Sequence, residues 1–164
     1  MAITASTWVR ADGIGLDQAI DTTSSTQVYK TGFRVVCRDM GSTDRGFGEF
    51  VYAKGVASVV AGDACIVSPG GDAAIRTVAA SHGPLGIAMA AIVASNWGWF
   101  QIFGRAICSV AASFADDLEV FTTATAGTLD DEVATNFVHG ARSAGAIDTG
   151  QALIDLWYPS AEAT

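Results

Sequence analysis

The stretch that decides the fold is GPLGIAMAAIVASNWGWFQIFG, residues 83–104, a long apolar run without a charged side chain. Most of its side chains must be buried, in a core, at a subunit interface or in a lipid bilayer. Leu85 to Phe103 is about as long as the roughly 20 residues with which a helix crosses a bilayer. The run is, however, interrupted by residues that break helices, namely Gly83, Pro84, Gly86 and Gly98. A membrane-spanning helix is therefore disfavoured.

The residue types within this run favour two β-strands instead. Residues 87–93 and 97–103 are rich in β-branched and aromatic side chains, and Ser95-Asn96 supplies a turn, so the pattern predicts a hairpin. Alternate residues of a strand point to opposite faces. Trp97, Trp99, Gln101 and Phe103 share one face, and Gly98, Phe100, Ile102 and Gly104 share the other. Because both faces are largely apolar, we expect this strand to be central in a sheet or to cover an interface.

Outside this run, short apolar segments alternate with turn-forming residues, and 18 glycines punctuate the chain. The expected strands are 28–38, 47–54, 58–60, 64–67, 74–78, 105–110, 118–122, 136–142 and 153–158. The strongest turn signal is Ser68-Pro69-Gly70-Gly71-Asp72. No segment has sustained helical periodicity, and the one helical candidate is a short turn near 113–118. The pattern predicts an all-β fold, either a compact antiparallel β-barrel or a β-sandwich.

The first 26 residues differ from the rest because they show little periodicity. We expect residues 1–26 to form an extended N-terminal arm, which either reaches a neighbouring molecule or is a frayed terminus. Residues 27–164 are long enough for a single β-rich domain with one core.

Composition narrows the possible partners. The chain has 17 acidic and 9 basic residues, a net charge of -8, and the basic residues are scattered singly from Arg10 to Arg142. Nucleic-acid binding requires a basic cluster, so nucleic acid is not an expected partner. Only 16% of residues are charged, which indicates that part of the surface is covered by partner molecules, most simply other copies of the chain.

The three cysteines, Cys37, Cys65 and Cys108, lie in apolar strand-like segments and are expected to be buried free thiols. Their odd number, together with a start that does not resemble a signal peptide, favours a reducing compartment and no export.

No motif in the sequence indicates catalysis or metal binding. Paired metal ligands such as CxxC or HxxxH are not found, and neither Ser81 nor Ser109 has the context of an activated nucleophile. The acidic groups at 116–117 and 130–132 are interpreted as solvated turns. We therefore predict no catalytic residue, no cofactor and no metal. A small hydrolase that uses His82 or His139 with an acidic partner is the alternative from the enzyme class.

Aromatic residues are the candidates for a binding surface. We expect Trp97, Trp99, Phe100, Phe103, Trp157 and Tyr158 to lie in the core or at an interface. An alternative is that Trp97, Trp99 and Phe100 form an exposed platform on which sugars stack.

Four segments, taken in their order along the chain, resemble the sequence of a known protein family. These segments are GFGEFVYAKGVASVVAGDACIV (46–67), ASHGPLGIAMAAIVASNWGWFQIFGRAICSV (80–110), TATAGTLDDEV (123–133) and LIDLWYP (153–159). Over about residues 30–158 the chain resembles capsid decoration, or cement, proteins of tailed bacteriophages. The motifs are structural, so no functional residue is carried over.

The resemblance implies a non-enzymatic virion protein that is made in the cytoplasm of a bacterial host. Such a protein would bind the outside of the assembled major capsid lattice as a homotrimer and stabilise the head, without contacting nucleic acid or membrane. The alternative is an adhesin on the head or tail that binds host glycans.

Overall fold

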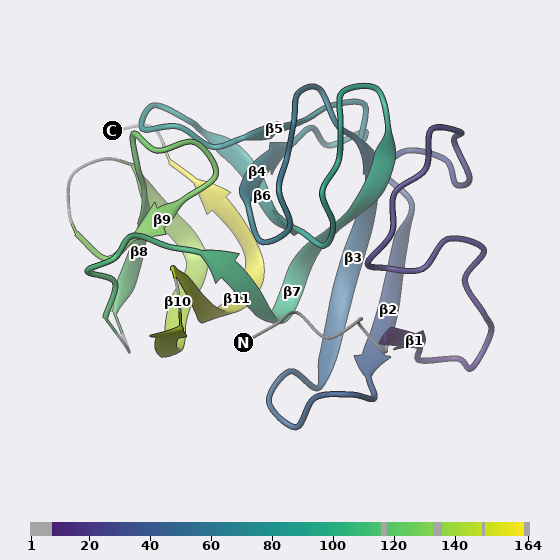
Figure 1. Ribbon diagram of the computed structural model, residues 1–164, viewed down its shortest axis with the longest axis horizontal. Helices are drawn as coiled ribbons and strands as arrows, with labels where there is room; N and C mark the ends of the chain where they lie inside the picture. The colour runs from purple at the N-terminus through teal and green to yellow at the C-terminus, as the bar shows by residue number, and fades with distance from the viewer. Residues whose placement is uncertain (1–7, 116–117, 133–135, 149, 163–164) are drawn as a thin grey trace.

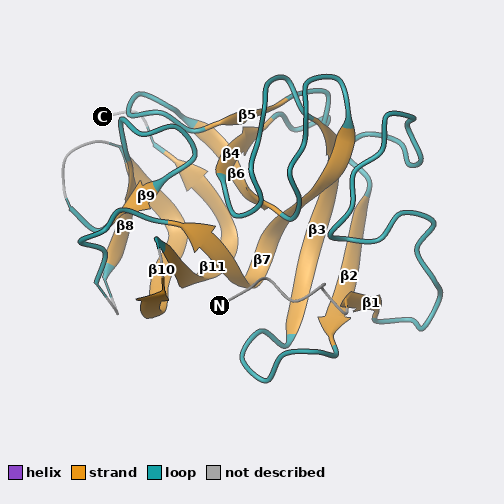
Figure 2. Ribbon diagram, in the orientation of Figure 1, coloured by secondary structure: helices purple, strands orange, loops and turns teal. Residues whose placement is uncertain are grey.

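The computed structural model describes residues 8–115, 118–132, 136–148 and 150–162 (Figure 1), and for 146–148 it describes the backbone alone. The described residues form eleven β-strands and no helix (Figure 2), which confirms the expected all-β class. In the described part of the chain, no helix is therefore long and apolar enough to span a membrane. The strands are β1 (Trp8–Arg10), β2 (Arg34–Asp39), β3 (Phe47–Lys54), β4 (Ala64–Val67), β5 (Ala74–Arg76), β6 (Gly83–Ala88), β7 (Trp97–Ser109), β8 (Glu119–Thr122), β9 (Leu129–Asp130), β10 (Phe137–Asp148) and β11 (Gln151–Ala161).

All eleven strands belong to one antiparallel sheet. Its main path runs β1-β2-β3-β7-β6-β11-β10-β8-β9, while β4 pairs with β5 and β6, and β7 pairs additionally with β11. In Figure 1, β2 and β3 lie on one side of the molecule, β8, β9 and β10 lie on the other, and β7 runs between them. The path is not closed into a barrel, so of the two expected architectures the structure has the sandwich-like one.

Strand β7 is the centre of the sheet, as the apolar pattern on both of its faces predicts. Its first half pairs with β3 and β6, and its second half pairs with β11. The separate strand expected at 105–110 is wrong, because β7 continues through Gly104 to Ser109. Gly104 has a φ of 87°, and the register between β3 and β7 shifts nearby, so the glycine bends the strand without ending it.

The hairpin expected from 87–93 and 97–103 is also partly wrong. Strand β6 ends at Ala88, and residues 89–96 form a loop. Within this loop Ile92 pairs with Val59 of another loop through two backbone hydrogen bonds of 2.9 Å. The segment is apolar because Ile92 enters the core, although the segment is not part of a regular strand.

Other boundaries differ in a similar way. The strand expected at 28–38 begins only at Arg34, and the strand expected at 58–60 is reduced to the single bridge at Val59. The helical turn expected near 113–118 is not found in its described residues: a turn at 111–114, in which the Phe114 N–H bonds the Ala111 carbonyl, overlaps only their start. Strands β10 and β11 are both longer than expected.

Buried apolar side chains form three clusters, all of which include residues of β7. The first cluster lies among β6, β7, β8, β10 and β11, the second among β3, β4, β6 and β7, and the third among β1, β2, β3 and β7. Cys108, Cys65 and Cys37 belong to the first, second and third cluster respectively, and all three are free thiols. The expected buried free cysteines are thus confirmed. Burial raises the pKa of the Cys37 thiol to about 11 and also raises the pKa of the Cys65 and Cys108 thiols.

The described part of the N-terminal segment packs on its own sheet. Strand β1 pairs with β2, and Trp8 and Ile20 are buried in the third cluster. Gln18 connects this segment to the core, because its side-chain oxygen accepts a 2.7 Å bond from the Tyr52 hydroxyl and its carbonyl accepts from the Trp99 indole N–H. Residues 1–7 of the expected arm lie outside the described residues.

Candidate interaction surface

The six aromatic residues singled out in the sequence divide into a buried and an exposed set. Trp99 and Phe100 are fully buried on opposite faces of β7, and Trp97 is partly buried against the third cluster. These three residues therefore do not form an exposed sugar platform. Phe103 is half-buried, whereas Trp157 and Tyr158 are 53% and 55% exposed, so they do not seal a core. Their assignment to an interface remains a prediction.

The exposed set belongs to one continuous surface that crosses four strands. Val36 lies opposite Glu49, Glu49 opposite Phe103, and Phe103 opposite Trp157, in β2, β3, β7 and β11. Directly opposed residues of an antiparallel sheet share a face. We call this surface the aromatic face and define it as Val36, Phe47, Glu49, Phe103, Trp157 and Tyr158.

An irregularity in β11 turns two adjacent aromatic rings outward. Leu156 is buried, so Trp157 points to solvent by strand alternation. Tyr158 would then point inward, but its φ of 51° places it in the left-handed region and its side chain is also exposed. The register between β10 and β11 shifts at this point, opposite Gly140, where a Cβ would lie 2.5 Å from the Trp157 carbonyl oxygen. A left-handed conformation costs a non-glycine residue roughly 1–2 kcal/mol, and such strain is often found at functional positions.

A small polar network fixes the Tyr158 ring. Its hydroxyl donates a 2.7 Å hydrogen bond to Glu49, and its ring centroid lies 5.5 Å from that of Phe103. Arg34 forms an ion pair with the other oxygen of the Glu49 carboxylate at 3.5 Å. The hydrogen bond to Glu49 favours the protonated phenol and raises the pKa of Tyr158, and the negative charge of Glu49 acts in the same direction. The face is therefore ordered before any partner binds.

Arginines surround the aromatic side chains. Arg38 places its guanidinium 5.7 Å from the centre of the Phe47 ring. Arg105 lies two residues after Phe103 in β7 and makes a bidentate ion pair with Asp155 at 2.7 and 3.0 Å. Exposed Trp, Tyr and Arg side chains on a rigid support are the residue types that dominate binding energy at protein interfaces.

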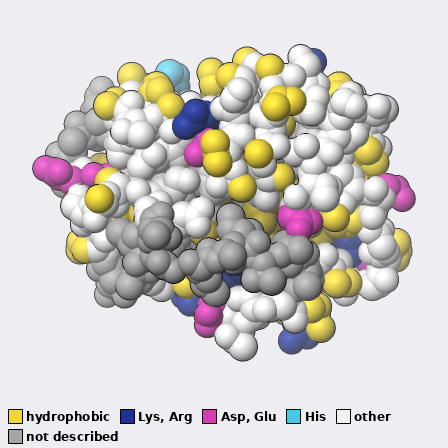
Figure 3. Space-filling view, in the orientation of Figure 1, with side chains coloured by type: hydrophobic (Ala, Val, Ile, Leu, Met, Phe, Trp, Pro, Cys, Tyr) yellow, Lys and Arg dark blue, Asp and Glu magenta, His cyan; other side chains and the backbone are white. Residues whose placement is uncertain are grey.

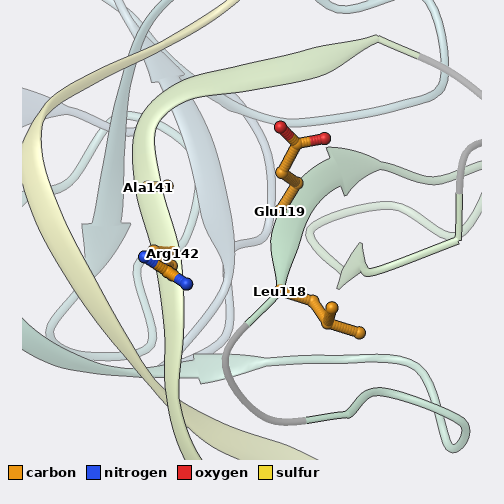
Figure 4. Close-up of a pocket in the computed structure, with 4 residues that line it drawn as sticks. All are labelled: Leu118, Glu119, Ala141 and Arg142. Carbon is orange, nitrogen blue, oxygen red and sulfur yellow. The ribbon is translucent and has the colours of Figure 1, made fainter.

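A second feature of the surface is a hollow of about 390 Å³ between β8 and β10. It is lined by Leu118, Glu119, Ala141 and Arg142, and Figure 4 shows that the Leu118 and Glu119 side chains point away from Arg142. The described lining includes no serine, cysteine or histidine, and its one carboxylate, Glu119, points away from Arg142. The hollow therefore offers no converging groups for catalysis among its described residues.

The histidines considered for a hydrolase lie on the surface. His82 is exposed, and His139 contacts the exposed carboxylate of Glu162 through Nε2. Within the described residues, no three His, Cys, Asp or Glu side chains are placed to hold a metal ion.

Sequence reasoning did not identify Val36, Phe47 or Glu49 as part of a site. Their association depends on the register of β2, β3 and β7, which no local motif encodes. Comparison of the chain with protein-family models, with curated proteins and with solved structures found no match.

Proposed function

We propose that this chain is a non-enzymatic capsid decoration protein of a tailed bacteriophage. It binds the exterior of the assembled major capsid lattice through the aromatic face and stabilises the head. The observation that carries the proposal is the exposed and preordered arrangement of Phe47, Trp157 and Tyr158 beside the Arg34–Glu49 ion pair. The sequence resemblance supplies the identity of the partner.

The electrostatics of the face favour a protein partner. Arg34 and Arg105 are paired with Glu49 and Asp155, and the chain as a whole has a net charge of -8. Phosphate backbones require a cluster of basic side chains with free charge, whereas two of the three arginines at this face are neutralised by carboxylates. A partner that covers the face would bury charges that already have counterions, which lowers the cost of removing them from water.

The size of the face suits a contact that is repeated over a shell. An aromatic side chain buries about 150–250 Å² when fully covered, so the three half-exposed rings leave roughly 300 Å² uncovered. A patch of this size is common at functional surfaces but supplies only part of a stable interface of about 800 Å² per partner. A protein that binds the assembled lattice and not free capsid subunits stabilises the assembled state by mass action.

Cryo-electron microscopy of virions from the phage that encodes the chain tests the proposal directly. We expect ordered density for this chain on the outside of the head. Density at the tail or fibres, or virions without the protein, would overturn it.

A binding assay then tests the aromatic face. We expect Trp157→Ala to lower binding of the purified protein to undecorated heads at least tenfold, because it removes the largest exposed ring. Ile14→Ala is the matched control, because Ile14 is exposed and lies outside the face. Equal binding by Trp157→Ala and wild type would exclude the face as the docking surface.

Glycan binding is the second candidate function for the same face. The observation in its favour is that Trp157 is exposed and directly precedes Tyr158, whose hydroxyl is bonded to the Glu49 carboxylate. An exposed aromatic ring can stack on a sugar, and polar groups on the same face can hydrogen-bond it. Saccharide-dependent quenching of tryptophan fluorescence that is lost in Trp157→Ala, together with no binding to heads, would favour this function.

A further inference from the structure

A second apolar surface lies on two loops along the upper edge of the molecule in Figure 1, away from the β2–β3 hairpin that carries Phe47. One loop connects β3 to β4 and the other connects β6 to β7. Val59 of the first loop and Ile92 of the second exchange two backbone hydrogen bonds, and both side chains are buried. Their neighbours therefore point outward, as in a short antiparallel ladder.

The outward positions carry aliphatic side chains. Val60 and Val93 flank the ladder, and Val56 follows Gly55, whose bridge to Ala74 brings the loop beside Ile75 of β5. We call Val56, Val60, Ile75 and Val93 the aliphatic end. Their side chains are 49% to 58% exposed. Figure 3 shows hydrophobic side chains along the upper edge and over the upper centre of the molecule.

Backbone hydrogen bonds hold the two loops in place. Gly55 N–H bonds the Asn96 carbonyl at 2.9 Å, Ser95 N–H bonds the Gly55 carbonyl at 2.9 Å, and Gly62 N–H bonds the Ala88 carbonyl at 2.8 Å. A surface that is already ordered loses little conformational entropy when it binds.

The aliphatic end is almost free of charge. Between Gly55 and Gly104 the only Asp, Glu, Lys or Arg residues are Asp63, Asp72 and Arg76. Asp63 is buried, accepts a 2.8 Å bond from the Val60 N–H and pairs with Arg76 at 2.9 Å. Asp72 is thus the one exposed carboxylate among residues 55–104, and nearly all of the net charge of -8 is carried by the rest of the chain.

We propose that the aliphatic end binds a second copy of this chain. Two molecules that each carry a net charge of -8 repel one another, and they approach most closely where neither presents a charge. Because the surface lies at one edge of the molecule, it can sit near a two-fold or three-fold axis, where equivalent side chains meet. The contact does not depend on the capsid partner proposed above.

Other occupants fit the aliphatic end less well. Loops that enter a membrane interface usually carry Trp, Tyr, Lys or Arg, and none of these occurs in residues 55–62 or 88–96. A sugar would need an aromatic ring on which to stack, which these loops also lack.

Light scattering after size-exclusion chromatography tests the proposal on the full chain. We expect the wild type at micromolar concentration to have the mass of two or three chains. Val60→Glu and Val93→Glu, tested as single variants, place like charges opposite one another and should each weaken association at least tenfold. Ile14→Glu adds the same charge at an exposed site outside the aliphatic end and should leave the mass unchanged.

Salt provides a second readout that a fold defect would not imitate. Added salt screens the long-range repulsion between acidic copies, so association of the wild type should strengthen between 0.05 and about 0.5 M salt. A monomeric wild type would overturn the proposal, as would correctly folded Val60→Glu and Val93→Glu variants with wild-type mass. Because the assay contains no capsid, its outcome is separate from that of the proposed decoration function.

Discussion

At Tyr158 a single backbone conformation decides what the surface presents. The left-handed φ of 51° brings the ring to the solvent side, where its hydroxyl reaches Glu49. The local strain is offset by this hydrogen bond and by the contact with Phe103. Glu49 therefore shapes the aromatic face by holding the Tyr158 ring in place.

The Tyr158–Glu49 pair predicts a specific alkaline titration. The pKa of Tyr158 is raised by its hydrogen bond to the Glu49 carboxylate, so Glu49→Gln should lower that pKa toward the usual value near 10. Because the folded-state pKa is the higher one, the stabilisation is complete below the ordinary tyrosine pKa. It is lost as the pH rises through the raised value. Absorbance of tyrosinate near 295 nm during a pH titration measures the shift.

Tyr158→Phe provides the control for this titration. It removes one tyrosine from the absorbance curve, and it leaves Tyr52, whose pKa is raised mainly by burial. If Glu49→Gln leaves the curve unchanged, the hydrogen bond does not hold Tyr158 in solution.

The sequence could identify Trp157 and Tyr158 as candidates but not their common orientation. Adjacent residues in a regular strand face opposite sides, so alternation alone predicts that one of the two is buried. The shift in register opposite Gly140 depends on the pairing of β10 with β11, which is a tertiary property. The same reason explains why Phe47 and Glu49 were not recognised as neighbours of Phe103.

At the scale of the elements, the continuous course of β7 depends on Gly104. Gly104 has a φ of 87°, and a Cβ at this position would lie 2.2 Å from the Phe47 carbonyl oxygen. Gly104→Ala should therefore lower the free energy of unfolding by about 3 kcal/mol or more, because it adds a backbone clash to an unfavourable conformation. Urea unfolding followed by tryptophan fluorescence measures the loss.

Gly46→Ala is the control that distinguishes the two effects expected in Gly104→Ala, the steric clash of the new Cβ and the cost of a left-handed backbone conformation. Gly46 has a φ of 60° in the β2–β3 turn, and a Cβ there would meet nothing within 4 Å. This variant should lose only about 1 kcal/mol, the cost of the left-handed conformation alone. Similar losses in the two variants would show that the chain at Gly104 relaxes and that the close approach to β3 is not needed.

The bounds of a strand can be predicted from sequence where the local pattern of apolar and polar residues determines them. They cannot be predicted where pairing with a distant segment determines them. The apolar pattern identified β3 and β4 with their observed bounds, and it placed the start of β7 correctly. It assigned residues 89–93 to a strand because they are apolar, although Ile92 is buried by a bridge to Val59. It also divided β7 at Gly104, since a glycine that bends a strand and a glycine that ends one look alike in sequence.

At the scale of the whole molecule, the three clusters are joined by one strand. Trp99 of β7 belongs to the third cluster, Phe100 to the second and Cys108 to the first. We therefore expect the clusters to unfold together, as one cooperative domain, although the third cluster also contains residues of the N-terminal segment. The expectation can be tested because each cluster contains one free cysteine.

Thiol labelling measures the opening of each cluster separately. The burial that raises the pKa of all three thiols suppresses the reactive thiolate, so labelling at pH 8 requires local or global opening. Labelling is followed by mass spectrometry at increasing urea and normalised to each cysteine's rate in the unfolded chain. Cys37, Cys65 and Cys108 should then give one common free energy of opening, equal to that of global unfolding. Faster labelling of Cys37 alone would contradict a single unit, because it would show that the cluster containing the N-terminal segment opens while β7 still holds the other two clusters together.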